Sequence, residues 1–291
     1  MRAAAVLALG LLLSAPGCGS NDAASTAQEG PRPGSLEALW KRPGEDVALV
    51  MGTSDYAAGP VRVSFLVITN RARPIERPTA RVWVSLGLDQ APFLTGTARL
   101  EDVGKGQRLY VADFEIPTPG KYFLLAEPVG GARIQGVGNV VVEERTKSPA
   151  VGERAFPSKT PTLADAPAEK LTTRNPPDTE LLRVSVADAL ARRDPFVLVF
   201  ATPKFCESRT CGPVVDVVDA VRRRAPGVRF IHVEIYEENN PALGTNRFVQ
   251  EWKLPTEPWI FLVGRDGLIK AKFEGAVSER ELEVAVARFL T

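Results

Sequence analysis

The sequence predicts two folded domains of different class, an all-β sandwich followed by an α/β domain. The chain has 291 residues, a length typical of two domains. Residues 36–145 contain short alternating segments separated by Gly and Pro, whereas residues 181–291 alternate apolar strands with helical segments. Residues 146–180 are rich in proline, which neither continues a helix nor donates to a sheet ladder. We therefore expect an interdomain linker there.

The N-terminus has the features of an export signal. Arg2 precedes an apolar run from Ala3 to Leu13, which is long enough for a signal peptide and too short for a membrane span. The small residues before Cys18 resemble the lipobox of bacterial lipoproteins, although Ala15 stands where an aliphatic residue is usual. The resemblance implies a signal peptide over 1–17 and lipid attachment at Cys18. The alternative is ordinary cleavage near Ala15.

Residues 18–35 are small and polar and are expected to form a flexible tether. Either form of cleavage predicts an extracytoplasmic protein. With the lipid, we expect a membrane-anchored bacterial lipoprotein, in a compartment where disulfides persist.

The N-terminal domain is predicted to be a β-sandwich because strands recur about every ten residues with turn residues between them. The segment resembles the immunoglobulin-like modules that accompany exported redox domains. It contains no cysteine and no histidine, so we expect a spacer or a binding module. The expected strands are residues 62–69, 80–86, 108–114, 121–126 and 137–142.

The C-terminal domain has the predicted order βαβαββα. Ser185 is placed to cap a helix that ends before Pro195. Residues 196–200 form an apolar run typical of a strand buried on both faces. Ser278 and Glu281 have the spacing of a capping box, which predicts the start of the last helix.

Composition excludes several functions. Lys and Arg total 36 and Asp and Glu total 35, for a net charge of +1, so nucleic-acid binding is not expected. The single histidine, His232, leaves no material for a multi-histidine metal site, and we expect it to be a core residue. We predict no cofactor and no metal. The remaining chemistry resides in two cysteines, Cys206 and Cys211.

The cysteine segment resembles the thioredoxin superfamily. A buried strand leads into the cysteines, Cys211-Gly212-Pro213 repeats the first three residues of the family's active-site motif, and Glu257-Pro258-Trp259 is similar to its cis-proline strand. The resemblance implies that Cys206 and Cys211 are catalytic and that Pro258 and Glu257 contact substrate. It places the cis bond at Pro258, with Pro255 as the competing position.

The sequence also departs from the family pattern. Val214 occupies the position of the second thiol, so the pair is C-x4-C, and Phe205 replaces the usual tryptophan. A helix beginning near Glu207 would make Cys206 the thiol at the helix N-terminus. A helix beginning after Gly212 would place Cys211 at the helix start and Cys206 in the preceding loop. Both geometries stay open, with Cys206 favoured as the attacking thiol.

The predicted function is an extracytoplasmic thiol–disulfide oxidoreductase whose partners are protein thiols and disulfides of the cell envelope or a reducing partner. The first alternative is a non-catalytic envelope lipoprotein that binds a partner, with a structural disulfide. The second is a thiol peroxidase, since Thr202 upstream of Cys206 resembles a peroxiredoxin pattern.

Overall fold

The computed structural model describes residues 30–206 and 210–291. The predicted signal peptide, the lipid-attachment residue Cys18 and the tether as far as residue 29 lie outside these ranges. None of the helices in the described part of the chain is long and apolar enough to cross a membrane.

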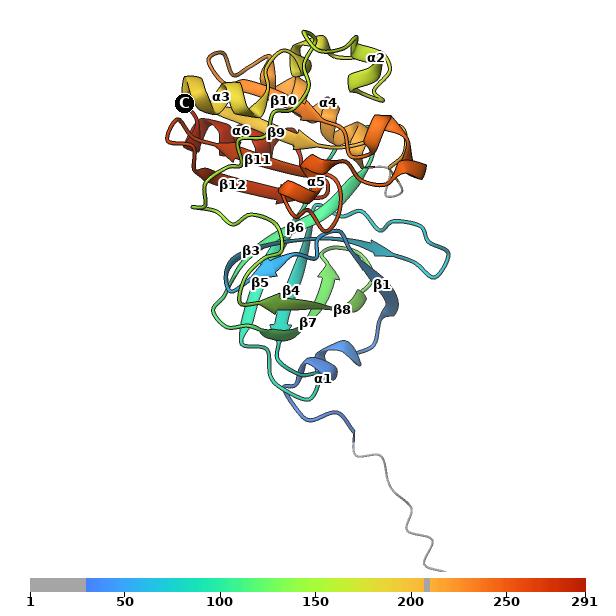
Figure 1. Cartoon of the computed structure of the whole chain (residues 1–291). Helices are drawn as coiled ribbons and strands as arrows, with labels where there is room; N and C mark the ends of the chain where they lie inside the picture. The colour runs from blue at the N-terminus through green and yellow to red at the C-terminus, as the bar shows by residue number, and fades with distance from the viewer. Residues whose placement is uncertain (1–29, 207–209) are drawn as a thin grey trace, which may run out of the picture. The chain divides into compact units, whose positions relative to one another are not determined.

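The first part of the chain forms one eight-stranded sheet (Figure 1). A short helix, α1 (Leu36–Trp40), precedes it and is capped by Ser35. The strands are β1 (Glu45–Met51), β2 (Tyr56–Ala57), β3 (Gly59–Ile68), β4 (Thr79–Ser85), β5 (Leu94–Asp102), β6 (Arg108–Ile116), β7 (Gly120–Pro128) and β8 (Ile134–Glu143).

Hydrogen bonding closes this sheet on itself. Its order is β1-β3-β6-β5-β4-β7-β8-β2, and β1 pairs in addition with β8, in parallel. Seven strands therefore form a closed barrel, with β2 added beside β8. The predicted immunoglobulin-like sandwich is wrong, because alternating strands suit both a sandwich and a barrel, and only the pairing of β1 with β8 decides between them.

The barrel interior follows from the period of two in each strand. Along β3, Val61, Val63, Phe65 and Val67 are all buried, and they pack with the inward residues of β4, β6 and β7. All five predicted strands of this region are present, but β1, β2 and β5 were not predicted. β5 was missed because every second residue from Thr95 to Arg99 is polar (Thr95, Thr97 and Arg99), so the strand contains few apolar residues.

The second sheet has four strands in the order β10-β9-β11-β12. They are β9 (Phe196–Phe200), β10 (Arg229–Val233), β11 (Trp259–Val263) and β12 (Ile269–Glu274). β9 pairs in parallel with β10 and antiparallel with β11. All five residues of β9 are buried, which confirms the strand predicted from the apolar run.

Apolar clusters cover both faces of this sheet. α4 (Cys211–Arg222) and α6 (Glu279–Phe289) pack on one face. α3 (Val186–Arg192) and α5 (Arg247–Glu251) pack on the other, around the fully buried Trp252. The predicted caps are confirmed, since Ser185 caps α3 and Ser278 forms the capping box of α6.

The predicted α/β thioredoxin-like fold class is nevertheless wrong for this chain. The chain is mostly β, a closed barrel followed by a separate small sheet, and helices are few and short. α3 has 7 residues and α5 has 5. The reason is that apolar runs and cap residues specify individual elements, whereas the class depends on pairings between distant segments.

The stretch between the two sheets contains little regular structure. Its elements are α2 (Ala168–Leu171) and a 3-10 turn, η1 (Thr179–Leu182). Ser158, Thr160, Thr172 and Leu181 are buried, so part of this segment packs against folded structure. Two further 3-10 turns, η2 (Glu237–Asn239) and η3 (Pro241–Leu243), precede α5.

Candidate dithiol site

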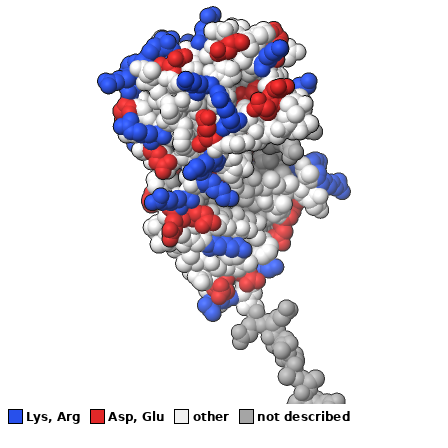
Figure 2. Space-filling model, viewed as in Figure 1, with Lys and Arg blue, Asp and Glu red and all other residues white. Residues whose placement is uncertain are grey.

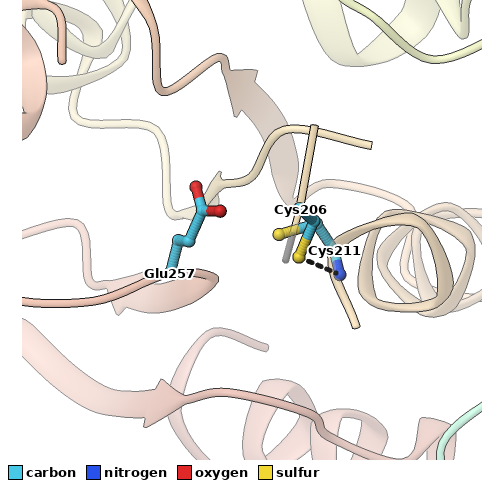
Figure 3. Close-up of side chains that lie close together, drawn as sticks. All are labelled: Cys206, Cys211 and Glu257. Atoms are coloured by element: carbon cyan, nitrogen blue, oxygen red, sulfur yellow. Dashed lines mark hydrogen bonds between the residues drawn. The ribbon is translucent and has the colours of Figure 1, made fainter. Parts of the chain in front are cut away.

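The structure brings together three of the residues predicted from the sequence. Cys206 lies in the segment after β9, Cys211 is the first residue of α4, and Glu257 lies two residues before the start of β11. Their sulfur and carboxylate oxygen atoms all lie within 4.8 Å of one another. Figure 3 shows the two sulfur atoms and the Glu257 carboxylate on the same side of the helix start.

The helix start resolves the two geometries left open by the sequence. α4 begins at Cys211, so Cys206 lies in the preceding segment. The main-chain N–H of Cys211 donates a hydrogen bond to Cys206 Sγ at 3.3 Å (Figure 3). The first N–H groups of a helix have no partner within it, so the sulfur of Cys206 takes the place of a capping oxygen.

The two thiols are not equivalent. Cys211 is fully buried and Cys206 is half-buried. The hydrogen bond between their side chains raises the pKa of the Cys211 thiol, burial raises it further, and the negative charges of Cys206 and Glu257 act in the same direction. These interactions hold the Cys211 thiol in its protonated form beside Cys206.

The peptide bond between Glu257 and Pro258 is cis, which confirms the position predicted for it over Pro255. Pro258 directly precedes the buried strand β11. Contact of Pro258 and Glu257 with substrate stays a prediction. A second cis bond, between Asn175 and Pro176, was not predicted.

His232 fixes the segment that carries Cys206. It is buried in β10, where Nε2 lies 3.0 Å from the carbonyl oxygen of Ala201 and Nδ1 lies 3.3 Å from Thr172 Oγ1. A carbonyl only accepts, so Nε2 carries a proton and donates a hydrogen bond to Ala201. The predicted core role of His232 is confirmed, and its position beside the cysteine segment was not predicted.

A second cross-link holds the same segment. Thr173 Oγ1 donates to the Glu234 carboxylate at 2.7 Å and accepts from the main-chain N–H of Lys204 at 3.1 Å. These contacts join residues far apart in sequence, so spacing alone gave no signal for them. The segment before Cys206 is thus anchored at Ala201 and at Lys204.

An open hollow of about 930 Å³ lies beside the site. Its lining includes Phe205 and Gly212 next to the cysteines, and Arg174 and Lys204 around them. Arg174 is engaged by Asp216 at 2.8 Å. On the face shown in Figure 2, acidic and basic side chains are interspersed, which agrees with the near-zero net charge.

Comparison with known proteins assigns no family. No family model matches the chain, and no curated protein matches it. The predicted membership of the thioredoxin superfamily is therefore wrong, and nothing in these comparisons supports the oxidoreductase class that the resemblance implied. The motifs behind the resemblance are each a few residues long, and they specify a helix start and a proline rather than a family.

Three solved structures show weak similarity. A cycloisomaltooligosaccharide glucanotransferase from Paenibacillus sp. is 17% identical over 40% of this chain and 17% of its own, with a TM-score of 0.25. The PKD domain of an M14-like peptidase from a Thermoplasmatales archaeon is 10% identical over 35% of this chain and 97% of its own, with a TM-score of 0.20. MtrC from Shewanella baltica is 13% identical over 77% of this chain and 51% of its own, with a TM-score of 0.23.

Proposed function

We propose that Cys206 and Cys211 carry out thiol–disulfide exchange with proteins outside the cytoplasm. The observation that carries this proposal is the hydrogen bonding of the pair, in which Cys206 Sγ accepts from the main chain of Cys211 at the start of α4. A helix N-terminus stabilises a thiolate through its dipole and its N–H groups. Cys206 is also the more exposed of the two residues.

In the proposed reaction the Cys206 thiolate attacks one sulfur of a substrate disulfide. A mixed disulfide forms, and the other substrate sulfur leaves as a thiolate and takes a proton. Cys211 then loses its proton and attacks Cys206 Sγ, which releases the second substrate thiol. The substrate gains two electrons, and the Cys206–Cys211 disulfide is reduced again by a dithiol partner.

The geometry is compatible with closing this disulfide. The two sulfurs lie within 4.8 Å of each other and must approach to about 2.05 Å. Cys211 is fixed at the helix start, so Cys206 is the residue that has to move. The anchors at Ala201 and Lys204 confine that movement to the residues nearest Cys206.

The test is redox titration of the full chain in glutathione buffers, with Cys18→Ser in every variant so that only the pair is counted. We expect a reversible two-electron transition between about −120 and −270 mV, the range of known exchange proteins. A bond that stays closed below about −300 mV would indicate a structural disulfide and overturn the proposal.

Single substitutions distinguish the two roles. Cys211→Ser should accumulate a mixed disulfide with a substrate peptide through Cys206, whereas Cys206→Ser should not, because Cys211 is buried. The matched control is the Cys18→Ser parent, which should show exchange and no trapped species. Trapping through Cys211 rather than Cys206 would contradict the assignment of the attacking thiol.

A further inference from the structure

The arrangement of Cys206, Cys211 and Glu257 also suits the binding of a metal ion, which does not depend on disulfide exchange. Among residues 30–206 and 210–291, these are the three Cys, His, Asp or Glu side chains whose ligand atoms converge on one point, all within 4.8 Å of one another. They come from three separate segments: Cys206 from the segment after β9, Cys211 from the start of α4 and Glu257 from the segment before β11. The fold, rather than a local sequence motif, brings them together.

The spacing suits a tetrahedral metal ion. Zinc binds thiolate sulfur at about 2.3 Å and carboxylate oxygen at about 2.0 to 2.2 Å. In a tetrahedral site those bond lengths place two sulfurs and one oxygen roughly 3.5 to 3.8 Å apart. Side chains whose atoms already lie within 4.8 Å can reach that geometry by movements of about 1 Å.

The donor set selects the metal. Two thiolates favour Zn²⁺ or Cu(I) over Mg²⁺ and Ca²⁺, and a carboxylate oxygen as third donor favours the divalent ion over Cu(I). With three protein ligands the fourth position is left for water or substrate. Cys206 and Glu257 are half-buried and Cys211 is buried, so an ion there is enclosed on one side and reachable from the other.

The surrounding main chain fits a bound anionic cluster. The N–H of Cys211 donates to Cys206 Sγ at 3.3 Å. Hydrogen bonds of this kind hold metal-bound thiolates in place. The first turn of α4, a helix of 12 residues, adds the positive end of its dipole on the same side.

We propose that Cys206, Cys211 and Glu257 form a three-ligand binding site for Zn²⁺ in the reduced protein. Each thiol releases its proton to solvent as the ion binds, and no oxidation or reduction takes place. Because a Cys206–Cys211 disulfide removes two of the three ligands, zinc binding and disulfide formation exclude each other at this site.

Binding is measured with the metal alone. The full chain carrying Cys18→Ser is reduced, freed of metal, and titrated with ZnCl₂ against a chromophoric chelator, and with CoCl₂ as an absorbing substitute. We expect one zinc per chain, and thiolate-to-cobalt charge transfer together with the intense visible bands of a tetrahedral site. Absence of stoichiometric binding, or octahedral cobalt without charge transfer, overturns the proposal.

Substitutions test each ligand. Cys206→Ser and Cys211→Ser should each abolish the cobalt charge-transfer pattern of a two-thiolate site. Glu257→Gln should weaken zinc binding at least about tenfold while both thiolates remain. Glu115→Gln is the matched control, because Glu115 is an exposed carboxylate on β6 and should leave the affinity unchanged. Equal affinity in the Glu257→Gln and control variants contradicts the carboxylate ligand, and a circular dichroism melt of each variant confirms that it folds.

The same variants separate this inference from the proposed function. Redox titration of the Cys18→Ser parent and of Glu115→Gln in the presence of a chelator measures the disulfide equilibrium without bound metal, and the two proteins should agree. If the disulfide forms and is reduced reversibly but no zinc binds, only the proposed metal site is refuted. If zinc binds but the disulfide never forms and opens reversibly, only the proposed thiol–disulfide exchange is refuted.

Discussion

Trp252 Nε1 donates a hydrogen bond to Ser158 Oγ over 3.1 Å. This bond ties the proline-rich stretch before the second sheet to the core of that sheet, because Trp252 is fully buried and contacts the rings of Phe156, Phe200 and Phe261. Ser158 Oγ in turn donates to the Glu251 carboxylate at 2.6 Å. A segment without regular structure thus shares the core on which β9 and the cysteine site rest.

Trp252→Ala should lower the free energy of unfolding by about 3 to 5 kcal/mol, because it opens a large cavity among aromatic rings. Ser158→Ala should lower it by about 1 to 3 kcal/mol, since the buried indole N–H loses its acceptor. Urea denaturation measures both. Val284→Ala, at a position 56% exposed, is the control and should change stability by less than about 0.5 kcal/mol. A Ser158→Ala protein as stable as the control would refute the bond.

The second prediction concerns closure of the barrel. Gly136 of β8 lies opposite Val47 of β1 in the parallel pairing. A Cβ atom at Gly136 would lie 2.9 Å from the carbonyl oxygen of Val47 and 3.1 Å from the Leu49 side chain. Gly136→Ala should therefore force β1 and β8 apart and destabilise the barrel by about 1 to 3 kcal/mol.

Gly138 provides the matched comparison. There an added Cβ would meet only side-chain atoms of Leu49 and Met51, at 3.3 Å and beyond. Gly138→Ala should be tolerated better than Gly136→Ala in thermal denaturation. Hydrogen exchange should also show faster exchange in β1 for Gly136→Ala. Equal melting temperatures for the two variants would mean that β1 does not close the barrel.

The elements that sequence predicted best are those defined by their own residues. The run Phe196–Phe200, the cap at Ser185 and the capping box at Ser278 each depend on a few neighbouring residues, and the structure confirms all three. β1 was missed because none of its seven residues is fully buried and its sequence does not alternate between apolar and polar residues. Its place in the sheet comes from pairing with β8, some ninety residues away.

The candidate site divides in the same way. Cys206, Cys211, Glu257 and the cis bond at Pro258 stand out by residue type, and the structure places the first three within 4.8 Å. The helix start at Cys211 was one of two open geometries. The contacts of His232 and Thr173 with the cysteine segment involve residues separated by about thirty positions or more, and no local pattern carries such pairings.

The third prediction concerns two carboxyl groups near η1. Burial raises the pKa of Asp178, and a hydrogen bond to Asp219 and the charge of Asp219 raise it further. Burial opposes the shift at Asp219, but the hydrogen bond from Asp178 and the guanidinium groups of Arg222 and Arg223 lower the pKa of Asp219. Asp178 also faces Arg174 at 3.8 Å and accepts from the N–H of Glu180.

The proton held by Asp178 makes the stability of the folded protein depend on pH. The folded protein holds a proton on Asp178 more tightly than the unfolded chain does, so this stabilisation is complete below the unfolded pKa and is lost as the pH rises through the folded one. Asp178→Asn keeps the donor to Asp219 at every pH. Chemical denaturation at pH 7 should therefore give a variant more stable by about 1 kcal/mol, with no advantage at low pH. Asp178→Ala, which lacks the donor, should show no such gain, and the same gain in both variants would refute the shared proton.

The last prediction concerns Lys272 on β12. Burial lowers its pKa to about 8, although the negative charges of Asp55, Glu274 and Glu153 oppose the shift. The ammonium donates to Thr146 Oγ1 and Ser148 Oγ, each at 2.8 Å. The folded state disfavours the charged form, so the penalty is absent above the unfolded pKa, grows as the pH falls toward the folded value and is complete below it. Below pH 8 it amounts to at most about 3 kcal/mol.

Lys272→Met should therefore stabilise the protein most below pH 8 and progressively less toward pH 10, because the neutral amine of the parent then carries no such penalty. The two hydroxyls keep other partners, since Thr146 donates to the carbonyl of Ser148 and Ser148 donates to Asp55. Lys270→Met is the control: Lys270 pairs with the half-exposed Asp266 at 2.6 Å, and its loss should give a small change with no comparable pH dependence. Melting curves from pH 6 to pH 10 measure the difference between the variants, and a gain for Lys272→Met that is independent of pH would mean that the ammonium is solvated.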